Sequence, residues 1–264
     1  MKTLDNEMIA KRYLAGENTY KLGRNLGVSY ETIRTRLHEM GIPIRTSSVR
    51  RRIYQCNHGC FTEKTINSMY YAGLLMADGN IRKDGRMVQI EVEKSDSCLL
   101  EGLKRFSGYG GELKHRVKRQ RSGHVSEMVA LRITSPQMVK DLDLFGVVPC
   151  KSKNGKIPQW VTRHPLAEFF FRGIFDGDGC VGIRRGVCHK GKKFATFCGN
   201  ISVVNSFRNW VEQRTGDRGG LFRRSNGLGV IHYSHGAVSR VGLCIYGNKT
   251  GMRLVRKSSI MCVV

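Results

Sequence analysis

Two segments of the chain combine small residues with a closing aspartate. They are YAGLLMADGN at residues 71–80 and FRGIFDGDGC at residues 171–180, and Asp78 of the first aligns with Asp178 of the second. Carboxylate oxygens are ligands that Mg²⁺ prefers in proteins, and bound Mg²⁺ can activate water and stabilise the leaving oxygen of a phosphodiester. Asp78 and Asp178 are therefore candidates for metal-dependent hydrolysis, provided that the fold brings them together.

The spacing of the small residues indicates how the two segments meet. The small positions are Gly73 and Ala77 in the first segment and Gly173 and Gly177 in the second. Residues four apart lie on one face of a helix, and small side chains there let two helix backbones approach closely. We expect these faces to form a helix interface that delivers both aspartates to one place. Adjacent carboxylates repel each other unless cations lie between them, which again favours Mg²⁺.

A single Asp-Gly pair has a simpler interpretation, as a helix cap followed by a turn. The duplication with matching small residues favours a paired site instead. Asp176 is a further carboxylate in the second segment, but Met76 stands at the equivalent position of the first. We therefore expect Asp176 to be a polar group at the helix end, with no paired role.

The balance of charge indicates a polyanionic partner. In 264 residues the chain has 45 Lys and Arg against 21 Asp and Glu, a formal net charge of +24. Such an excess favours nucleic acid, because binding to phosphates releases condensed counterions. An anionic membrane surface is the alternative, but the sequence has no long basic amphipathic stretch and no apolar run of membrane length. No membrane partner is expected.

Cysteine usage indicates the compartment. The chain has nine cysteines at irregular spacing, and its first residues, MKTLDNEMIA, lack the apolar core of a secretion signal. This is typical of free thiols in a reducing environment. We expect an intracellular protein, in the cytoplasm of a bacterial or phage-infected host or in an organelle.

Residues 1–45 carry the pattern of a helix-turn-helix domain. The predicted helices cover 6–15, 19–26 and 30–40, with a glycine turn before the third. In the third helix Ile33 and Leu37 face inward, so Arg34 and Arg36 project outward. We expect these arginines to contact DNA; a small structural three-helix cap is the alternative.

Residues 46–65 are expected to be a basic linker, with the run VRRR at 49–52. Such a run lies along phosphates in many proteins, or is simply solvated. Cys56, His58 and Cys60 follow, but a tetrahedral zinc site needs a fourth ligand, and no further Cys or His pair lies nearby. A zinc-dependent regulator is therefore a remote alternative.

The remainder predicts two half-domains, 66–150 and 151–264, that repeat one order of elements. In the first, a strand (86–93), a helix (95–106), two hairpin strands (112–119 and 125–134) and a helix (136–144) follow the motif helix. In the second, the same order covers 194–198, 202–213, 221–224, 229–233 and 237–246. The expected fold class is α+β, with two sheets of antiparallel strands joined by a central helix pair.

From Phe61 to Lys257 the chain resembles the LAGLIDADG homing endonucleases, in the single-chain form that carries both motifs. The inter-repeat segment LFGVVPCKSKNGKIPQWV and the late RLVRK are similar to the family's, and some members carry an accessory helix-turn-helix domain. The resemblance implies a pseudo-twofold pair of αββαββα modules with saddle-shaped sheets. It also implies a monomeric, site-specific double-strand DNA endonuclease with a long asymmetric target, which leaves short 3′ overhangs.

The resemblance also assigns roles to single residues. Asp78 and Asp178 would bind Mg²⁺ (or Mn²⁺ or Ca²⁺), with the backbone carbonyls of Ala77 and Gly177 as further ligands. A polar residue after the first long strand orders water in the family; Lys94 stands there in the first half, and Gly199 or Asn200 in the second. A basic residue near the end of the last strand is also common, where this chain has Ser135 and His235. Lys94 and His235 are thus the further catalytic candidates.

Contacts to DNA are expected from alternate residues of the sheet faces and from the hairpin tips. Beside Arg34 and Arg36, the candidates are Arg82, Lys83, Arg86, Gln89, Glu91, Lys114, Arg116, Lys118, Arg184, Arg185, Lys192, Lys193, Arg223 and Arg224. Arg and Gln can make bidentate contacts with guanine and adenine, whereas Lys more often binds phosphates. For any one of them, a plain solubilising charge is the alternative.

A second functional class is a nucleic-acid binder that does not cleave, either an intron RNA maturase or a transcription regulator. The retention of both aspartates favours the enzyme, because a binder gains nothing from two carboxylates beside phosphates. Intron RNA remains a possible partner, since splicing activity can coexist with cleavage. The chain starts at Met1 without the Cys or Ser of an intein, so an intron-encoded or free-standing gene is expected.

Overall fold

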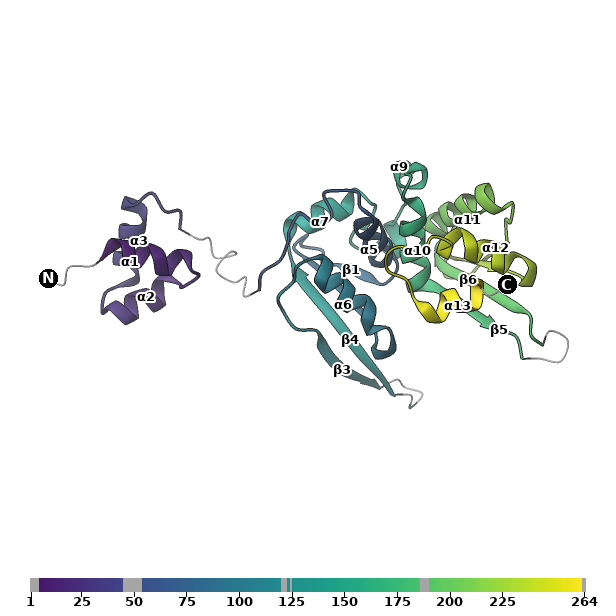
Figure 1. The fold of residues 1–264 in the computed structure, drawn as a ribbon, viewed down its shortest axis with the longest axis horizontal. Coiled ribbons are helices and arrows are strands. Elements are labelled where there is room, and N and C mark those ends of the chain that lie inside the picture. The colour runs from purple at the N-terminus through teal and green to yellow at the C-terminus, as the bar shows by residue number, and fades with distance from the viewer. Residues whose placement is uncertain (1–4, 45–53, 120–122, 124, 186–189, 263–264) are drawn as a thin grey trace. The chain divides into compact units, whose positions relative to one another are not determined.

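The computed structural model describes residues 5–44, 54–119, 123, 125–185 and 190–262 (Figure 1). The basic run at 49–52 lies outside these residues. The chain divides into two compact units, Met1–Tyr54 and Gln55–Val264. No helix among the described residues has both the length and the apolar character that crossing a membrane requires.

Within residues 5–44 the first unit is built from three helices. They are α1 (Asn6–Leu14), α2 (Thr19–Leu26) and α3 (Tyr30–Glu39). Each begins at a polar N-cap whose side chain accepts a hydrogen bond from the first turn, namely Asp5, Asn18 and Ser29. Gly27 ends α2 with φ of 69°, a left-handed conformation that favours glycine and allows α3 to follow after a short turn. The core is formed by Ile9, Tyr13, Leu22, Ile33 and Leu37.

The described part of the second unit contains two four-stranded antiparallel sheets. The first has the order β1-β2-β4-β3 and consists of β1 (Gly79–Ile81), β2 (Met87–Glu93), β3 (Lys114–Arg119) and β4 (Val125–Thr134). The second has the order β5-β6-β8-β7 and consists of β5 (Gly179–Ile183), β6 (Lys193–Asn200), β7 (Gly220–Arg223) and β8 (Leu228–Tyr233). The identical order confirms the predicted α+β fold of two repeated halves.

Each sheet buries one face under helices and leaves the other open. In β2 the buried residues Val88, Ile90 and Val92 alternate with more exposed ones, because successive side chains of a strand point to opposite faces. The covering helices are η1 (Lys94–Asp96), α6 (Ser97–Phe106) and α7 (Pro136–Asp143) in the first half, and α11 (Ile201–Thr215) and α12 (His235–Tyr246) in the second.

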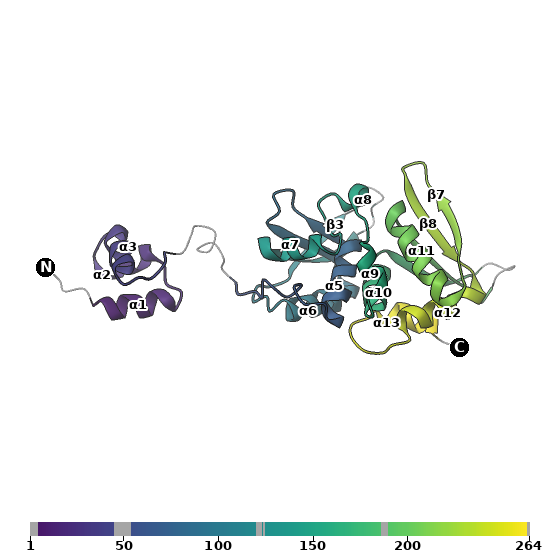
Figure 2. The ribbon, with the colours of Figure 1, turned by 90° about the horizontal axis from the view of Figure 1, so that it is seen from above.

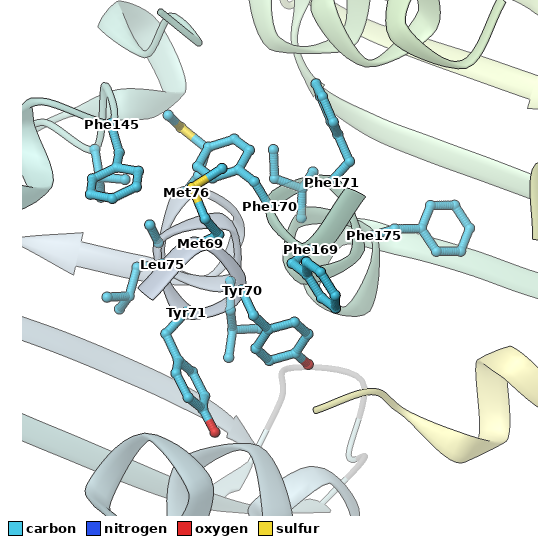
Figure 3. Close-up of a cluster of buried hydrophobic side chains, with 14 of the residues drawn as sticks. Met69, Tyr70, Tyr71, Leu75, Met76, Phe145, Phe169, Phe170, Phe171 and Phe175 are labelled. Carbon is cyan, nitrogen blue, oxygen red and sulfur yellow. The ribbon is translucent and has the colours of Figure 1, made fainter. Parts of the chain in front are cut away.

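The two motif helices lie side by side between the sheets (Figures 1 and 2). They are α5 (Ile66–Ala77) and α10 (Ala167–Asp178). Both are apolar on nearly every side, as expected of helices at the centre of a core. Figure 3 shows aromatic side chains of both helices, with Phe145 nearby, and Phe170 stacks on Phe145. Phe171 stacks on Trp210 of α11. One hydrophobic core therefore runs through both halves.

Three short helices were not expected from the sequence. The connection between the halves contains α8 (Lys151–Asn154) and α9 (Gln159–Arg163), and the segment after α12 leads to α13 (Val255–Cys262). The N-cap of α8 is Cys150, whose φ of 55° makes it the one non-glycine residue of the described chain in the left-handed region. Both α8 and α13 direct lysines toward the ends of the motif helices.

Candidate active centre between the motif helices

Backbone contact between α5 and α10 depends on glycine. A Cβ atom added at Gly73 would lie 1.9 Å from the carbonyl oxygen of Phe170, and one added at Gly173 would lie 2.0 Å from the carbonyl oxygen of Tyr70. Both distances are far inside van der Waals contact, so no side chain fits at either position. The two helices touch main chain to main chain, which fixes how their C-terminal ends meet.

The two aspartates lie at these adjoining ends. Asp78 is the C-cap of α5 and Asp178 is the last residue of α10. A Cβ atom added at Gly177 would lie 2.4 Å from the Cβ of Ala77 and 2.9 Å from Oδ2 of Asp78, so the first carboxylate borders the end of the second helix. The interface residues and both aspartates thus gather at one place.

The electrostatics of the two carboxylates are coupled. Solvent reaches both side chains, yet the helix ends around them displace enough water to raise the pKa of each. For Asp178, burial and then the negative charge of Asp78 raise the pKa to about 6. For Asp78, burial raises the pKa, while the charges of Lys151 and Lys257 oppose the increase. A cation at this centre would relieve the repulsion.

Two lysines that sequence reasoning missed reach the same helix ends. Nζ of Lys151, from α8, donates to the carbonyl oxygen of Ala77 at 2.5 Å. Nζ of Lys257, from α13, donates to the carbonyl oxygens of Phe175, Asp176 and Gly177 at 2.9, 2.6 and 3.3 Å. Positive charge stabilises the C-terminal end of a helix, where carbonyl groups lack partners. Burial lowers the pKa of both lysines, and nearby aspartates oppose that shift.

Asp176 has a structural role that differs from the polar helix end expected of it. Its side chain is buried and accepts hydrogen bonds from the hydroxyls of Tyr70 and Tyr246 at 2.7 and 2.6 Å, and from the backbone N–H of Leu254 at 3.0 Å. Burial raises the pKa of Asp176, while the two tyrosine hydrogen bonds act against the increase. This carboxylate joins α5, α12 and the segment before α13.

Arg172 holds the same segment from the other side. The guanidinium is fully buried and donates to the carbonyl oxygens of Ile245, Asn248 and Thr250 at 2.8, 2.7 and 2.7 Å. A buried guanidinium needs such partners, since five N–H donors are costly to desolvate. Arg172 and Asp176 together fix residues 245–254, and thereby place Lys257 on the end of α10.

The other catalytic candidates lie farther out. Lys94 begins η1, is exposed, and donates to Oε2 of Glu127 at 2.6 Å. His235 accepts a hydrogen bond from the backbone of Lys193, which pairs with Ile183. Ile183 is four residues along β5 from Gly179, so about 13 Å of strand separates His235 from the level of the aspartates. The structure does not bring His235 to the centre.

Two polar residues near the centre hold the short helices beside it in place. Asp96, at the end of η1, forms a bidentate ion pair with Arg256 of α13 at 2.9 and 2.5 Å, and its charge contributes to the raised pKa of Asp78. Asn200 donates to the carbonyl oxygens of Ser152 and Lys153 at 3.1 and 2.9 Å. Asn200 therefore holds α8, the helix that carries Lys151.

The donor set suits a hard divalent cation. Carboxylate and backbone carbonyl oxygens are the ligands of Mg²⁺ and Ca²⁺, and a carbonyl oxygen has two lone pairs, so it can accept from lysine and still face a metal. Within the described residues no group of three or more His, Cys, Asp or Glu side chains could hold a metal. An ion between Asp78 and Asp178 would therefore complete its shell with backbone, water or phosphate oxygens.

On the first sheet, five candidate DNA-binding residues lie on the open face. They are Gln89, Glu91, Lys114, Arg116 and Lys118. Glu91 forms an ion pair with Arg116. Gln89 pairs with Arg132, an exposed residue of the same face that sequence reasoning missed, although the alternation of β4 could have found it. Arg82, Lys83 and Arg86 lie in the loop between β1 and β2.

On the second sheet, the basic candidates lie around the open face. Arg184, Arg185 and Lys192 belong to the hairpin between β5 and β6, and Arg224 follows β7. Lys193 and Arg223 share the alternation of buried residues such as Ala195 and Ile231, so both lie on the helix-covered side at strand ends. In the first unit, Arg34 and Arg36 stand on α3 and form ion pairs with Glu31 and Glu39 at 3.3 and 3.5 Å.

Comparisons with known proteins give a sequence relative and structural neighbours. No protein-family profile matches the chain. The probable translation initiation factor IF-2 of Methanocaldococcus jannaschii is 26% identical over 203 residues, which cover 70% of this chain and 16% of that protein. The chain therefore corresponds to a small part of that relative's length.

Among solved structures, the homing endonuclease I-WcaI bound to its DNA recognition sequence has a TM-score of 0.55 at 13% identity, over 76% of this chain and 88% of that one. The LAGLIDADG homing endonuclease I-LtrWI bound to target DNA has a TM-score of 0.46 at 12% identity, over 74% and 87%. The similarity to I-WcaI covers 76% of this chain, so the chain has a LAGLIDADG-type fold.

Proposed function

We propose that this protein is a site-specific endonuclease that hydrolyses both strands of a DNA duplex with the help of divalent metal. The observation that carries the proposal is the meeting of Asp78 and Asp178 at the ends of two helices in backbone contact. Two adjacent carboxylates that are partly removed from water destabilise a fold unless cations lie between them. In a chain of net charge +24, such cations would lie beside the phosphates of a nucleic acid.

The residues of the centre would have different roles in hydrolysis. Asp78 and Asp178, with the carbonyl oxygens of Ala77 and Gly177, would hold Mg²⁺, which lowers the pKa of bound water and stabilises the leaving oxygen. Lys151 and Lys257 keep positive charge next to the carboxylates. Such fixed charge favours an entering phosphate and the additional negative charge of its transition state. Each half would cleave one strand, leaving short 3′ overhangs.

The two open sheet faces would lie along the major groove of a long asymmetric target. Both halves belong to one chain, so a monomer suffices for two cuts. The first unit would add contacts through Arg34 and Arg36, whose side chains are accessible to solvent on its third helix, α3. Lys94 would act at the edge of the centre, through water, rather than as a metal ligand.

Incubation of the purified chain with a plasmid that carries the uninterrupted form of its host locus tests the proposal. With Mg²⁺ we expect one linear product, and with EDTA none. Mapping the ends of that product gives the overhang. Binding of the locus with no linear product in Mg²⁺ or Mn²⁺ would refute the nuclease and leave a binding protein.

A second candidate function is a binder of DNA or intron RNA that does not cleave. One observation favours it: lysine ammonium groups already donate to the carbonyl oxygens of Ala77 and Gly177, which a metal would use. Calorimetric titration with Ca²⁺ separates the two functions. A nuclease centre should bind Ca²⁺, and Asp178→Asn should lose that binding. A binder should show none with either protein.

A further inference from the structure

The open faces of the two sheets differ in chemistry. On the first, the outward side chains include charged and amide groups: Gln89, Glu91, Lys114, Arg116, Lys118 and Arg132. These groups can donate to or accept from base edges and phosphates. The first sheet therefore has what is needed to read DNA by hydrogen bonds.

The second sheet presents apolar and sulfur side chains instead. Its outward residues include Phe194, Thr196 and Cys198 of β6, Val230 and His232 of β8, and Phe222 of β7. The strand register makes them neighbours, since Val230 pairs with both Cys198 and Phe222, and His232 pairs with Thr196. Phe222 is 62% exposed. None of these side chains carries a carboxylate, ammonium or guanidinium group.

The helices that cover this sheet lie on its other side, and α8 reaches the open face at Asn200, at the end of β6. The helices α11 and α12 contact β6 and β8, and the buried residues Ala195, Phe197, Ile231 and Tyr233 lie on their side of the sheet. The outward residues are partly or fully exposed. A contiguous apolar patch on an otherwise highly charged protein marks a binding surface.

Charge at the border of the patch identifies the class of partner. Arg184 places its guanidinium over the ring of Phe194, 5.6 Å from the centroid, and lies 3.1 Å from Nε2 of His232. Burial and this arginine lower the pKa of His232, so its ring remains neutral. Arg185 and Lys192 stand beyond, in the same hairpin. Basic groups at one end of an apolar floor match a polyanion that also exposes apolar groups.

Duplex DNA meets that description in its major groove. The phosphates run along the edges, and the apolar group displayed on the floor is the 5-methyl of thymine. The first sheet, in the same unit, has the hydrogen-bonding groups. We propose that the second sheet reads its half of the target mainly through thymine methyl groups, so this half is rich in A·T pairs, whereas the first sheet reads its half by hydrogen bonds. This inference rests on the proposed function, because it requires that the protein binds DNA.

Selection from a random duplex library with the full chain in Ca²⁺ provides the first measurement. The expected result is a bound site in which one half prefers T·A pairs and the other contains fixed G·C pairs. Gln89→Ala identifies the half under the first sheet, because base preference should relax there. Failure to enrich any sequence would overturn the proposed function together with this inference.

Replacing thymine by deoxyuridine in the selected site removes methyl groups and nothing else. In the half under the second sheet we expect binding to weaken by about fourfold for each contacted methyl group. The same replacement in the other half should have little effect. An A·T-rich half whose affinity does not change with uracil would overturn methyl reading and leave DNA binding intact.

A matched pair of variants assigns the effect to the sheet face. Val230→Thr substitutes a hydroxyl for a methyl on the apolar floor. It should reduce the uracil penalty, which is the loss of affinity on replacing thymine by deoxyuridine. Val117→Thr makes the same change in β3, where Val117 pairs with Glu127 on the side away from the open face. Equal uracil penalties in the parent protein and in both variants would contradict the assignment to this surface.

Discussion

At the scale of single residues, the centre contains ionisable groups whose pKa values are shifted in the direction that favours the neutral form. Asp78 and Asp178 carry raised pKa values, and Lys151 and Lys257 carry lowered ones, mainly because all four are partly removed from water. Perturbation of this kind clusters at functional sites. It arises from the ends of α5 and α10, which crowd two acids into one space.

Substitution of either aspartate should abolish cleavage and spare binding. For Asp78→Asn or Asp178→Asn we expect the single-turnover cleavage rate to fall by roughly two orders of magnitude or more, because a bound ion contributes several kcal/mol to phosphodiester hydrolysis. Affinity for DNA should stay within about threefold of the parent, because the sheets are unchanged. Asp143→Asn, at the exposed end of α7, is the control and should cleave normally. Parental cleavage by either motif variant would contradict the assignment.

The raised pKa of Asp178 predicts how stability depends on pH in the absence of metal. Between its ordinary value of 3.8 and about 6, the folded protein holds a proton that the unfolded chain releases. The contribution of this group to the free energy of unfolding therefore falls as pH rises through that window. Thermal melts in EDTA should show Asp178→Asn more stable than the parent at pH 7.5, with the difference diminishing toward pH 4. A constant difference across that range would mean that the carboxyl is not perturbed.

Lys151 offers a test of fixed positive charge. Lys151→Met should reduce the cleavage rate on the order of a hundredfold, since it removes a preorganised donor from the centre. Lys153→Met, on the same short helix but with an exposed side chain, is the matched control. Single-turnover rates and Ca²⁺ affinity should be measured for both. If the two variants cleave equally well, Lys151 serves only to cap α5.

At the scale of elements, the pair α5 and α10 determines whether the centre forms. Gly73→Ala should destabilise the fold by about 3 kcal/mol or more, because the new methyl group meets a backbone oxygen that cannot move aside. Gly236→Ala is the control in α12, where an added Cβ meets nothing within 4 Å, and it should stabilise by about 0.5–1 kcal/mol. Urea unfolding measures both. Similar stability of the two variants would exclude close packing at Gly73.

The helix pair and most of the strands could be predicted from sequence because local patterns determine them, but β1 and β5 fall outside every predicted strand range. Small residues at i and i+4 mark the helix faces, and strict alternation marks strands such as β2. The short helices α8, α9 and α13 could not be predicted in this way. α8 and α9 have four and five residues, too few to show a period. α8 also depends on Asn200, a residue about 50 positions later in the chain, and the segment before α13 is held by Arg172 and Asp176.

At the scale of the whole molecule, the parts of the site that escaped prediction are those that require the folded chain. Lys151 and Lys257 bond to carbonyls 74 and 80 residues away in sequence. Both lie in segments that resemble the family's, LFGVVPCKSKNGKIPQWV and RLVRK, but the resemblance assigned neither lysine a role. The candidate His235 was chosen by its position after a strand, but the register places that strand end away from the aspartates. The strongly positive composition predicted a nucleic-acid partner, but it could not indicate which face is charged and which is apolar.

Excess positive charge also predicts a steep dependence of DNA affinity on salt. Replacing both α3 arginines, by Arg34→Ala and Arg36→Ala together, should reduce the slope of log Kobs against log[salt] by about 0.9 for each phosphate that the protein no longer neutralises. Cleavage of saturated DNA should not change, since the centre belongs to the other unit. Lys11→Ala on α1 is the control. An unchanged slope in the double variant would mean that α3 does not touch phosphates.

The way in which residues 245–254 are tied down has a consequence for biosynthesis. Lys257 caps α10 only once Arg172 and Asp176 have bound the stretch that follows α12. A growing polypeptide on the ribosome would thus have both motif aspartates long before it gains this ammonium group. Under the proposed nuclease function, the centre would lack this charge until residue 257 has been synthesised, and a frameshift after α12 would remove it.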